Sequence, residues 1–187
     1  MADQTFTSGQ VLTAAQQSAL QSNIGLTYIS EVNFTGARPA QAIGVFTSAF
    51  TNYRIVANVY GSAAEELYLR FYSGTSTELS SANYNRYGAS QTTTGAITSA
   101  YADSATRFVL GDVNNSSTTI NPIVMDIFNP NTATRTSVSW QSFGMGNGQY
   151  LSCVGQVTVN TVLTGFLLQG LNNNITGSVQ IYGYRKG

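Results

Sequence analysis

The chain reads Tyr53-Arg54-Ile55-Val56-Ala57-Asn58-Val59-Tyr60 at its clearest strand and Leu67-Tyr68-Leu69-Arg70-Phe71-Tyr72 at the next one. β-Branched and aromatic residues dominate both stretches and recur at every second position, which is typical of β-strands. The segment 61–66 between them has the length and composition of a connecting turn. We therefore expect these two strands to form a hairpin.

The same period-two pattern continues on both sides of this pair. It predicts further strands at 26–34, 43–50, 106–110, 120–128, 134–140, 150–161, 165–168 and 178–184. Polar, glycine-bearing stretches separate these segments, and no crossover helix lies between them. About ten short strands of this kind predict an all-β fold, an antiparallel β-sandwich that is jelly-roll-like. Residues 26–187 form this domain.

Residues 1–25 follow a different pattern and are interpreted as an N-terminal attachment arm. One short helix is predicted at 13–24, with Thr13 as its capping residue and Gly25 at its C-terminal end. No charged residue occurs from Gln4 to Ser30. A short helix is marginal alone in water, so its apolar stripe must pack on its own domain or on a partner. The stripe consists of Leu12, Ala15, Ala19, Leu20 and Ile24.

Charge is scarce throughout the chain. Only 9% of the 187 residues are charged and none is His, whereas an ordinary soluble domain is about one-quarter charged. Proton transfer and metal binding depend mostly on His, Cys and carboxylates, so we predict no enzymatic activity, no catalytic residue, no metal site and no cofactor. The 8 basic and 8 acidic residues cancel, which argues against nucleic-acid binding. A surface with so few charges favours association, so we expect the chain to belong to an assembly.

Few residues suggest a particular chemistry. Cys153 lies in an apolar run and is interpreted as a buried small residue, since no His exists to activate it. The glycine-dense stretch 144–148 is interpreted as a hairpin rather than a phosphate loop, because a strand is expected after it.

The N-terminus lacks the features of a signal peptide and no run is long enough to span a membrane, so we expect synthesis in the cytoplasm and no membrane insertion.

Two kinds of side chain remain as candidates for recognition or catalysis. Glu31 and Asp126 lie in predicted strands and could point inward, but nothing in the sequence pairs them as a glycosidase requires. Tyr84, Tyr87 and Tyr101 occur in polar, loop-like context, where aromatic rings can stack on sugars or anchor a protein interface. Tyrosines at the rim of the core, with the hydroxyl in water, are an equally good interpretation.

The segment 6–16, Phe-Thr-Ser-Gly-Gln-Val-Leu-Thr-Ala-Ala-Gln, resembles the start of many tailed-bacteriophage tail and fibre proteins, with Gly9, Leu12, Thr13 and Ala14 at matching positions. Segments 46–55, 67–71 and 177–185 are similar to recurring patterns in phage virion proteins. The resemblance implies β-sandwich heads, commonly trimeric, and an N-terminal segment that docks onto the particle.

The leading hypothesis from the sequence is a non-enzymatic virion structural protein, a homotrimeric tail or fibre component that contacts other virion proteins. A capsid decoration protein that stabilises the shell is one alternative. A module that binds a host surface glycan is another, and a polysaccharide depolymerase is a third.

Overall fold

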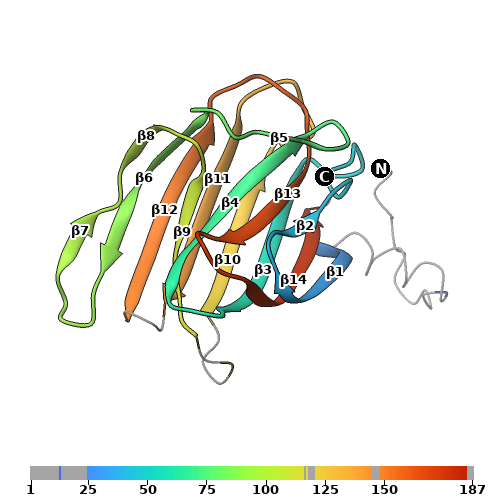
Figure 1. The fold of residues 1–187 in the computed structure, drawn as a ribbon. Helices are drawn as coiled ribbons and strands as arrows, with labels where there is room; N and C mark the ends of the chain where they lie inside the picture. The colour runs from blue at the N-terminus through green and yellow to red at the C-terminus, as the bar shows by residue number, and fades with distance from the viewer. Residues whose placement is uncertain (1–12, 14–24, 116, 118–120, 145–147, 185–187) are drawn as a thin grey trace, which may run out of the picture.

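The computed structural model describes residue 13 and residues 25–115, 117, 121–144 and 148–184. Strands are the regular elements of this part, and every strand pair in it is antiparallel (Figure 1). The strands are β1 (Leu26–Ala37), β2 (Ala40–Ala42), β3 (Asn52–Gly61), β4 (Glu65–Ser73), β5 (Thr77–Glu78), β6 (Tyr84–Gln91), β7 (Ile97–Ser99), β8 (Ala102–Ala105), β9 (Phe108–Val113), β10 (Asn121–Phe128), β11 (Thr136–Gly144), β12 (Gln149–Val157), β13 (Leu163–Gly170) and β14 (Ile175–Tyr184).

These strands form two sheets that pack face to face. The nine-stranded sheet has the order β1-β14-β3-β10-β11-β12-β6-β7, with β8 also paired to β6. The five-stranded sheet has the order β2-β13-β4-β5, with β9 also paired to β4. Figure 1 shows the smaller sheet lying across one face of the larger one. The expected all-β, antiparallel β-sandwich is therefore confirmed.

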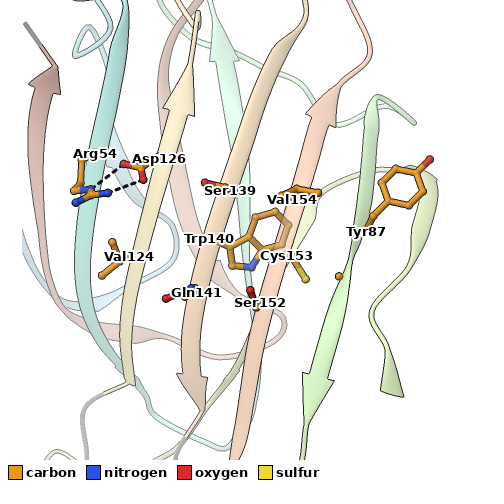
Figure 2. Close-up of a pocket in the computed structure, with 11 residues that line it drawn as sticks. Arg54, Tyr87, Val124, Asp126, Ser139, Trp140, Gln141, Ser152, Cys153 and Val154 are labelled. Carbon is orange, nitrogen blue, oxygen red and sulfur yellow. Dashed lines mark hydrogen bonds and ion pairs between the residues drawn. The ribbon is translucent and has the colours of Figure 1, made fainter. Parts of the chain in front are cut away.

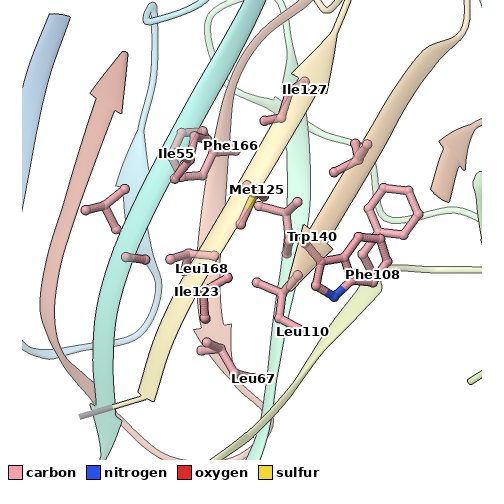
Figure 3. Packing of buried hydrophobic residues seen from close by; sticks show 14 of the residues in the cluster. Ile55, Leu67, Phe108, Leu110, Ile123, Met125, Ile127, Trp140, Phe166 and Leu168 are labelled. Carbon is pink, nitrogen blue, oxygen red and sulfur yellow. The ribbon is translucent and has the colours of Figure 1, made fainter. Parts of the chain in front are cut away.

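Strict alternation of burial builds the core between the sheets. Along β10 buried and more exposed residues alternate, so Ile123, Met125 and Ile127 point inward and their neighbours face outward. One buried and one solvated face is usual for antiparallel sheets. Figure 3 shows Trp140 of the larger sheet packed near Phe108 of the smaller one. The inner face of the central strands β3, β10, β11 and β12 is thus buried in the core, and their outer face is the one left open.

The hairpin expected between the two clearest strands is wrong. β3 lies in the nine-stranded sheet, between β14 and β10, whereas β4 lies in the five-stranded sheet. The connecting segment crosses the edge of the sandwich, where the Gly61 N–H donates to the Asn114 carbonyl and the Ser62 N–H to the Asn174 carbonyl. Both strands point every second residue into the core. This pattern is the same whether two consecutive strands pair in one sheet or lie in different sheets, so it does not distinguish a hairpin from a connection between the sheets.

The predicted strand at 43–50 is also wrong. Gly44 has φ +74°, which breaks an extended backbone, and β2 ends at Ala42. Phe46 then folds into the core, with its ring 4.8 Å from Tyr53 and 6.0 Å from Phe166. The segment 43–50 is therefore a loop that contributes Phe46 to the core, and it does not pair with a strand of either sheet.

The predicted helix at 13–24 lies outside the described residues, apart from Thr13, and so do the stripe residues Leu12, Ala15, Ala19, Leu20 and Ile24. No helix of the described part has the length and apolar character needed to cross a membrane.

Candidate functional site

The outer face of the nine-stranded sheet carries the candidate site. Strand register places five outward-facing residues in one row across β3, β10, β11, β12 and β6. Arg54 pairs with Asp126, Asp126 with Ser139, Ser139 with Val154, and Val154 with Tyr87. Arg54, Asp126, Ser139 and Val154 each lie between two buried residues of their strand, and Tyr87 is 49% exposed, so the row faces away from the core.

A charged cluster stands at one end of this row. The Arg54 guanidinium donates to both carboxylate oxygens of Asp126, at 2.8 and 2.7 Å, and the Tyr184 hydroxyl donates to the same carboxylate at 2.6 Å. The guanidinium also lies 5.7 Å from the centre of the Tyr184 ring. Burial raises the pKa of Asp126, but the hydrogen bonds from Arg54 and Tyr184 outweigh it, so the net shift is downward. The cluster is therefore an internally neutralised ion pair at neutral pH.

Small side chains leave a hollow of about 420 Å³ beside this cluster. Figure 2 shows the Arg54–Asp126 pair on one side of it and Tyr87 on the other, with Ser139 and Ser152 between them. Gln141 also lines this hollow. The pocket thus has a charged pair at one end, an aromatic ring at the other, and uncharged polar groups between.

Two further hollows continue this one along the strand direction. A hollow of about 330 Å³ shares Tyr87, Ser139 and Val154 with it, and one of about 180 Å³ shares Val124 and Gln141. Because each of these hollows shares lining residues with the central one, the three lie side by side, and together they are here called the outer groove. From Pro122 to Phe128 on β10 it extends for about 20 Å.

Three polar side chains between the two ends of the central hollow have no hydrogen-bond partner among the described residues. Ser139, Gln141 and Ser152 make no side-chain hydrogen bond to any described residue, and all three retain access to solvent. Sequence reasoning did not select them. The signal that could have found them is the alternation of buried and outward residues along β11 and β12. Ser139 and Gln141 flank the buried Trp140, and Ser152 precedes the buried Cys153, so all three face outward.

Of the tyrosines selected from the sequence, the structure brings two together. Tyr87 and Tyr101 are 49% and 57% exposed, and their ring centres lie 5.3 Å apart. The surface interpretation is wrong for Tyr84, which is fully buried. Its ring stacks 6.5 Å from Phe71 and lies 4.9 Å from Phe108. β6 begins at this residue and turns the ring into the core, so the polar neighbours that suggested a loop are the outer residues of a strand.

The Tyr84 hydroxyl accepts the Phe71 N–H at 3.0 Å and donates to the Leu79 carbonyl at 2.8 Å. The Tyr84→Phe variant is expected to lose about 1–3 kcal/mol of unfolding free energy, because two buried polar groups lose their partner. Urea unfolding measures this. Tyr87→Phe is the matched control and should change stability by less than about 0.5 kcal/mol. Equal losses in the two variants would contradict the structural role given to the Tyr84 hydroxyl.

Glu31 and Asp126 are not brought together. Both side chains face outward rather than into the core, since Glu31 is exposed on β1 and Asp126 lies in the outward row. Strands β14 and β3 separate them, and Glu31 is level with Val124 rather than Asp126, so their backbones are more than about 14 Å apart. Paired glycosidase carboxylates are about 5–10 Å apart. Asp126 is also engaged by Arg54, which leaves it poorly suited to proton transfer.

Removing the Asp126 charge is expected to lower stability in a pH-dependent way. The folded pKa of this carboxyl lies below its ordinary value of 3.8, so its contribution is present above that value and is lost as the pH falls through the folded pKa. Asp126→Asn should cost about 1 kcal/mol at pH 7 and progressively less near pH 2, measured by thermal unfolding. Glu31→Gln is the matched control and should show no such trend. A cost for Asp126→Asn that is independent of pH would show that shape, not charge, matters at this position.

Cys153 is buried, as expected, and burial raises the pKa of its thiol to about 11. β11 and β12 pair antiparallel on either side of the glycine-dense stretch, in agreement with a hairpin there. In the described part of the chain, no three His, Cys, Asp or Glu side chains group as metal ligands.

No protein-family model matches the chain, and no curated protein matches its sequence. Among solved structures it is similar to a variant fructofuranosidase from Schwanniomyces occidentalis complexed with fructosylnystose, with a TM-score of 0.25, 11% identity, and coverage of 88% of this chain and 34% of the other. Fructofuranosidase from the same organism complexed with fructose gives a TM-score of 0.24 and 9% identity, with coverage of 86% and 34%. The chain thus spans about one third of these proteins, and the scores are too low to indicate a shared fold or activity.

Proposed function

We propose that the chain is a non-enzymatic structural protein of a phage virion, a tail or fibre component whose β-sandwich is a binding module. The observation that carries this proposal is the outer face of the nine-stranded sheet. Its strands β3, β10, β11 and β12 contain only two charged residues, Arg54 and Asp126, and these neutralise each other. A face of this kind is suited to contact with another molecule rather than to catalysis.

Exposed apolar side chains on this face support the same proposal. Large hydrophobic residues that are at least 36% exposed gather there from four adjacent strands: Val124, Phe128, Phe143, Tyr150, Val154 and Tyr87. Contiguous exposed apolar surface on a soluble protein usually marks an interaction site. The phage assignment itself rests on the sequence resemblance, and so does the proposal of a homotrimer made in the host cytoplasm and held in the particle by residues 1–25.

We also propose the finer description, jelly-roll-like, for the sandwich. The chain crosses between the sheets from β3 to β4 and again from β13 to β14. β3 pairs with β14 in the nine-stranded sheet, and β4 pairs with β13 in the five-stranded sheet. The β3–β4 connection therefore lies beside the β13–β14 connection. Nested crossings of this kind support that description.

The proposed function is tested by locating and counting the chain in purified particles. Antibody labelling should place it at the tail, and quantitative mass spectrometry should give far fewer copies than the major shell subunit. A copy number close to that of the shell subunit would favour capsid decoration instead. Absence of the chain from particles would overturn the virion assignment.

A further inference from the structure

The outer groove offers apolar contact surface over its whole length. Phe143 and Tyr150 border the hollow at one end, and Tyr87 and Phe128 border the hollow at the other. These rings are held by paired strands and lose little freedom when a ligand binds, which favours binding. A ligand that follows the groove meets an apolar surface in each of the three hollows.

Polar groups lie between these apolar surfaces. The hydroxyls of Ser139 and Ser152 and the amide of Gln141 are free to donate and accept hydrogen bonds in the central hollow. Sugar rings have the matching chemistry, because they present C–H bonds on their faces and hydroxyl groups at their edges. A purely apolar ligand would leave these polar groups without partners on burial, at a cost in free energy.

The charges of the groove select against an acidic ligand. Arg54 is the groove's one cation among the described residues, and its Nε and Nη2 atoms donate to the Asp126 carboxylate, which neutralises its charge. An anionic sugar would approach the Asp126 carboxylate without an uncommitted cation to balance it. A neutral ligand meets no such penalty and can still hydrogen-bond to the outer atoms of the pair.

A second copy of this face fits the groove less well. Two identical hollowed faces packed together would place hollow against hollow, leaving voids and burying the Ser139, Gln141 and Ser152 groups without complementary partners. The length of the groove, about 20 Å along β10, instead matches an extended chain of several sugar units.

We propose that the outer groove binds a linear, uncharged polysaccharide, with sugar rings against the exposed aromatic side chains and their hydroxyls hydrogen-bonded to Ser139, Gln141 and Ser152. This inference deepens the proposed function and rests on it for the source of the ligand, which is the surface of the host cell.

The test is binding of the full chain to an array of neutral and acidic polysaccharides, followed by affinity measurements on the neutral glycan that binds best. Ser139→Trp fills the central hollow and should weaken binding at least tenfold. Gln141→Ala removes one free amide and should weaken it about five- to tenfold. Ser76→Trp, in the exposed turn before β5, is the matched control and should bind as the unaltered chain does. Circular dichroism and thermal unfolding confirm that each variant is folded.

Each other outcome overturns the inference. Absence of binding to every neutral glycan, a preference for acidic glycans, or equal binding by Ser139→Trp would each exclude the groove as a neutral sugar site. An oligomer of the unaltered chain that Ser139→Trp dissociates, seen by sedimentation, would make the groove a protein interface. Incorporation of Ser139→Trp into particles is measured separately: loss of glycan binding with normal incorporation separates this inference from the virion assignment.

Discussion

Replacing Phe108 with alanine is expected to lower the unfolding free energy by about 3–5 kcal/mol, the largest loss we expect from a single truncation in this chain. Phe108 is fully buried on β9, at the centre of an aromatic cluster. Its ring lies 4.9 Å from Tyr84, 5.4 Å from Trp140 and 6.3 Å from Phe71. Tyr84 and Trp140 belong to one sheet and Phe71 to the other, so the ring joins both halves of the core.

Phe128→Ala is the matched control for Phe108→Ala. It removes the same side chain from the outer face, where Phe128 is already 36% exposed, and should cost about 1 kcal/mol or less. Guanidinium unfolding of both variants measures the difference. Equal costs would contradict the placement of the Phe108 side chain in the core between the sheets. The control also reports on the outer groove, since Phe128 should matter more for glycan binding than for stability.

Gly165→Ala is expected to cost about 3 kcal/mol through a clash that the backbone cannot relieve. A Cβ at this position would collide with the Ala42 carbonyl oxygen and approach the Ile43 Cα to 2.8 Å. These atoms belong to main chain at and just beyond the end of β2, so the strand itself must move away from β13. The expected result is lower stability together with faster amide exchange in β2, measured by hydrogen–deuterium exchange.

Gly44→Ala separates this steric effect from backbone strain. Gly44 has φ +74° and no heavy atom within 4 Å of the position its Cβ would take, so alanine there should cost only about 1–2 kcal/mol. If Gly165→Ala costs no more than this control, the close packing of β2 on β13 is not what requires glycine at position 165.

Long strands with one buried face were predictable from the sequence. The prediction at 53–60 corresponds to β3, and the prediction at 120–128 corresponds to β10, because apolar residues recur at every second position and form the buried face. β6 was missed, since Tyr84 is its only large apolar residue that points inward. Its hydrogen-bonded pairing with β12, from Gln91 with Tyr150 to Tyr84 with Val157, makes it a strand although its own sequence lacks an alternating apolar pattern.

The candidate site was predictable only in part. Tyr87 was selected from its aromatic character, but the groove beside it depends on which strands are neighbours, and period two does not reveal that. Ser139, Gln141 and Ser152 are ordinary polar residues in sequence. They become a set only because β11 and β12 pair in a register that places Gln141 directly beside Ser152.

The position of β14 has a consequence for how the chain acquires its structure. β14 lies between β1 and β3, so the partner that joins these two strands is synthesised after every other strand that the structure describes. Pairing over such sequence separations makes folding slow, because a long loop must close before its contacts stabilise it. On a ribosome that has not yet released residues 175–184, β1 and β3 would both lack this neighbour. The larger sheet is thus completed only once β14 has emerged, and nascent chains that still lack β14 are the state most exposed to misassociation.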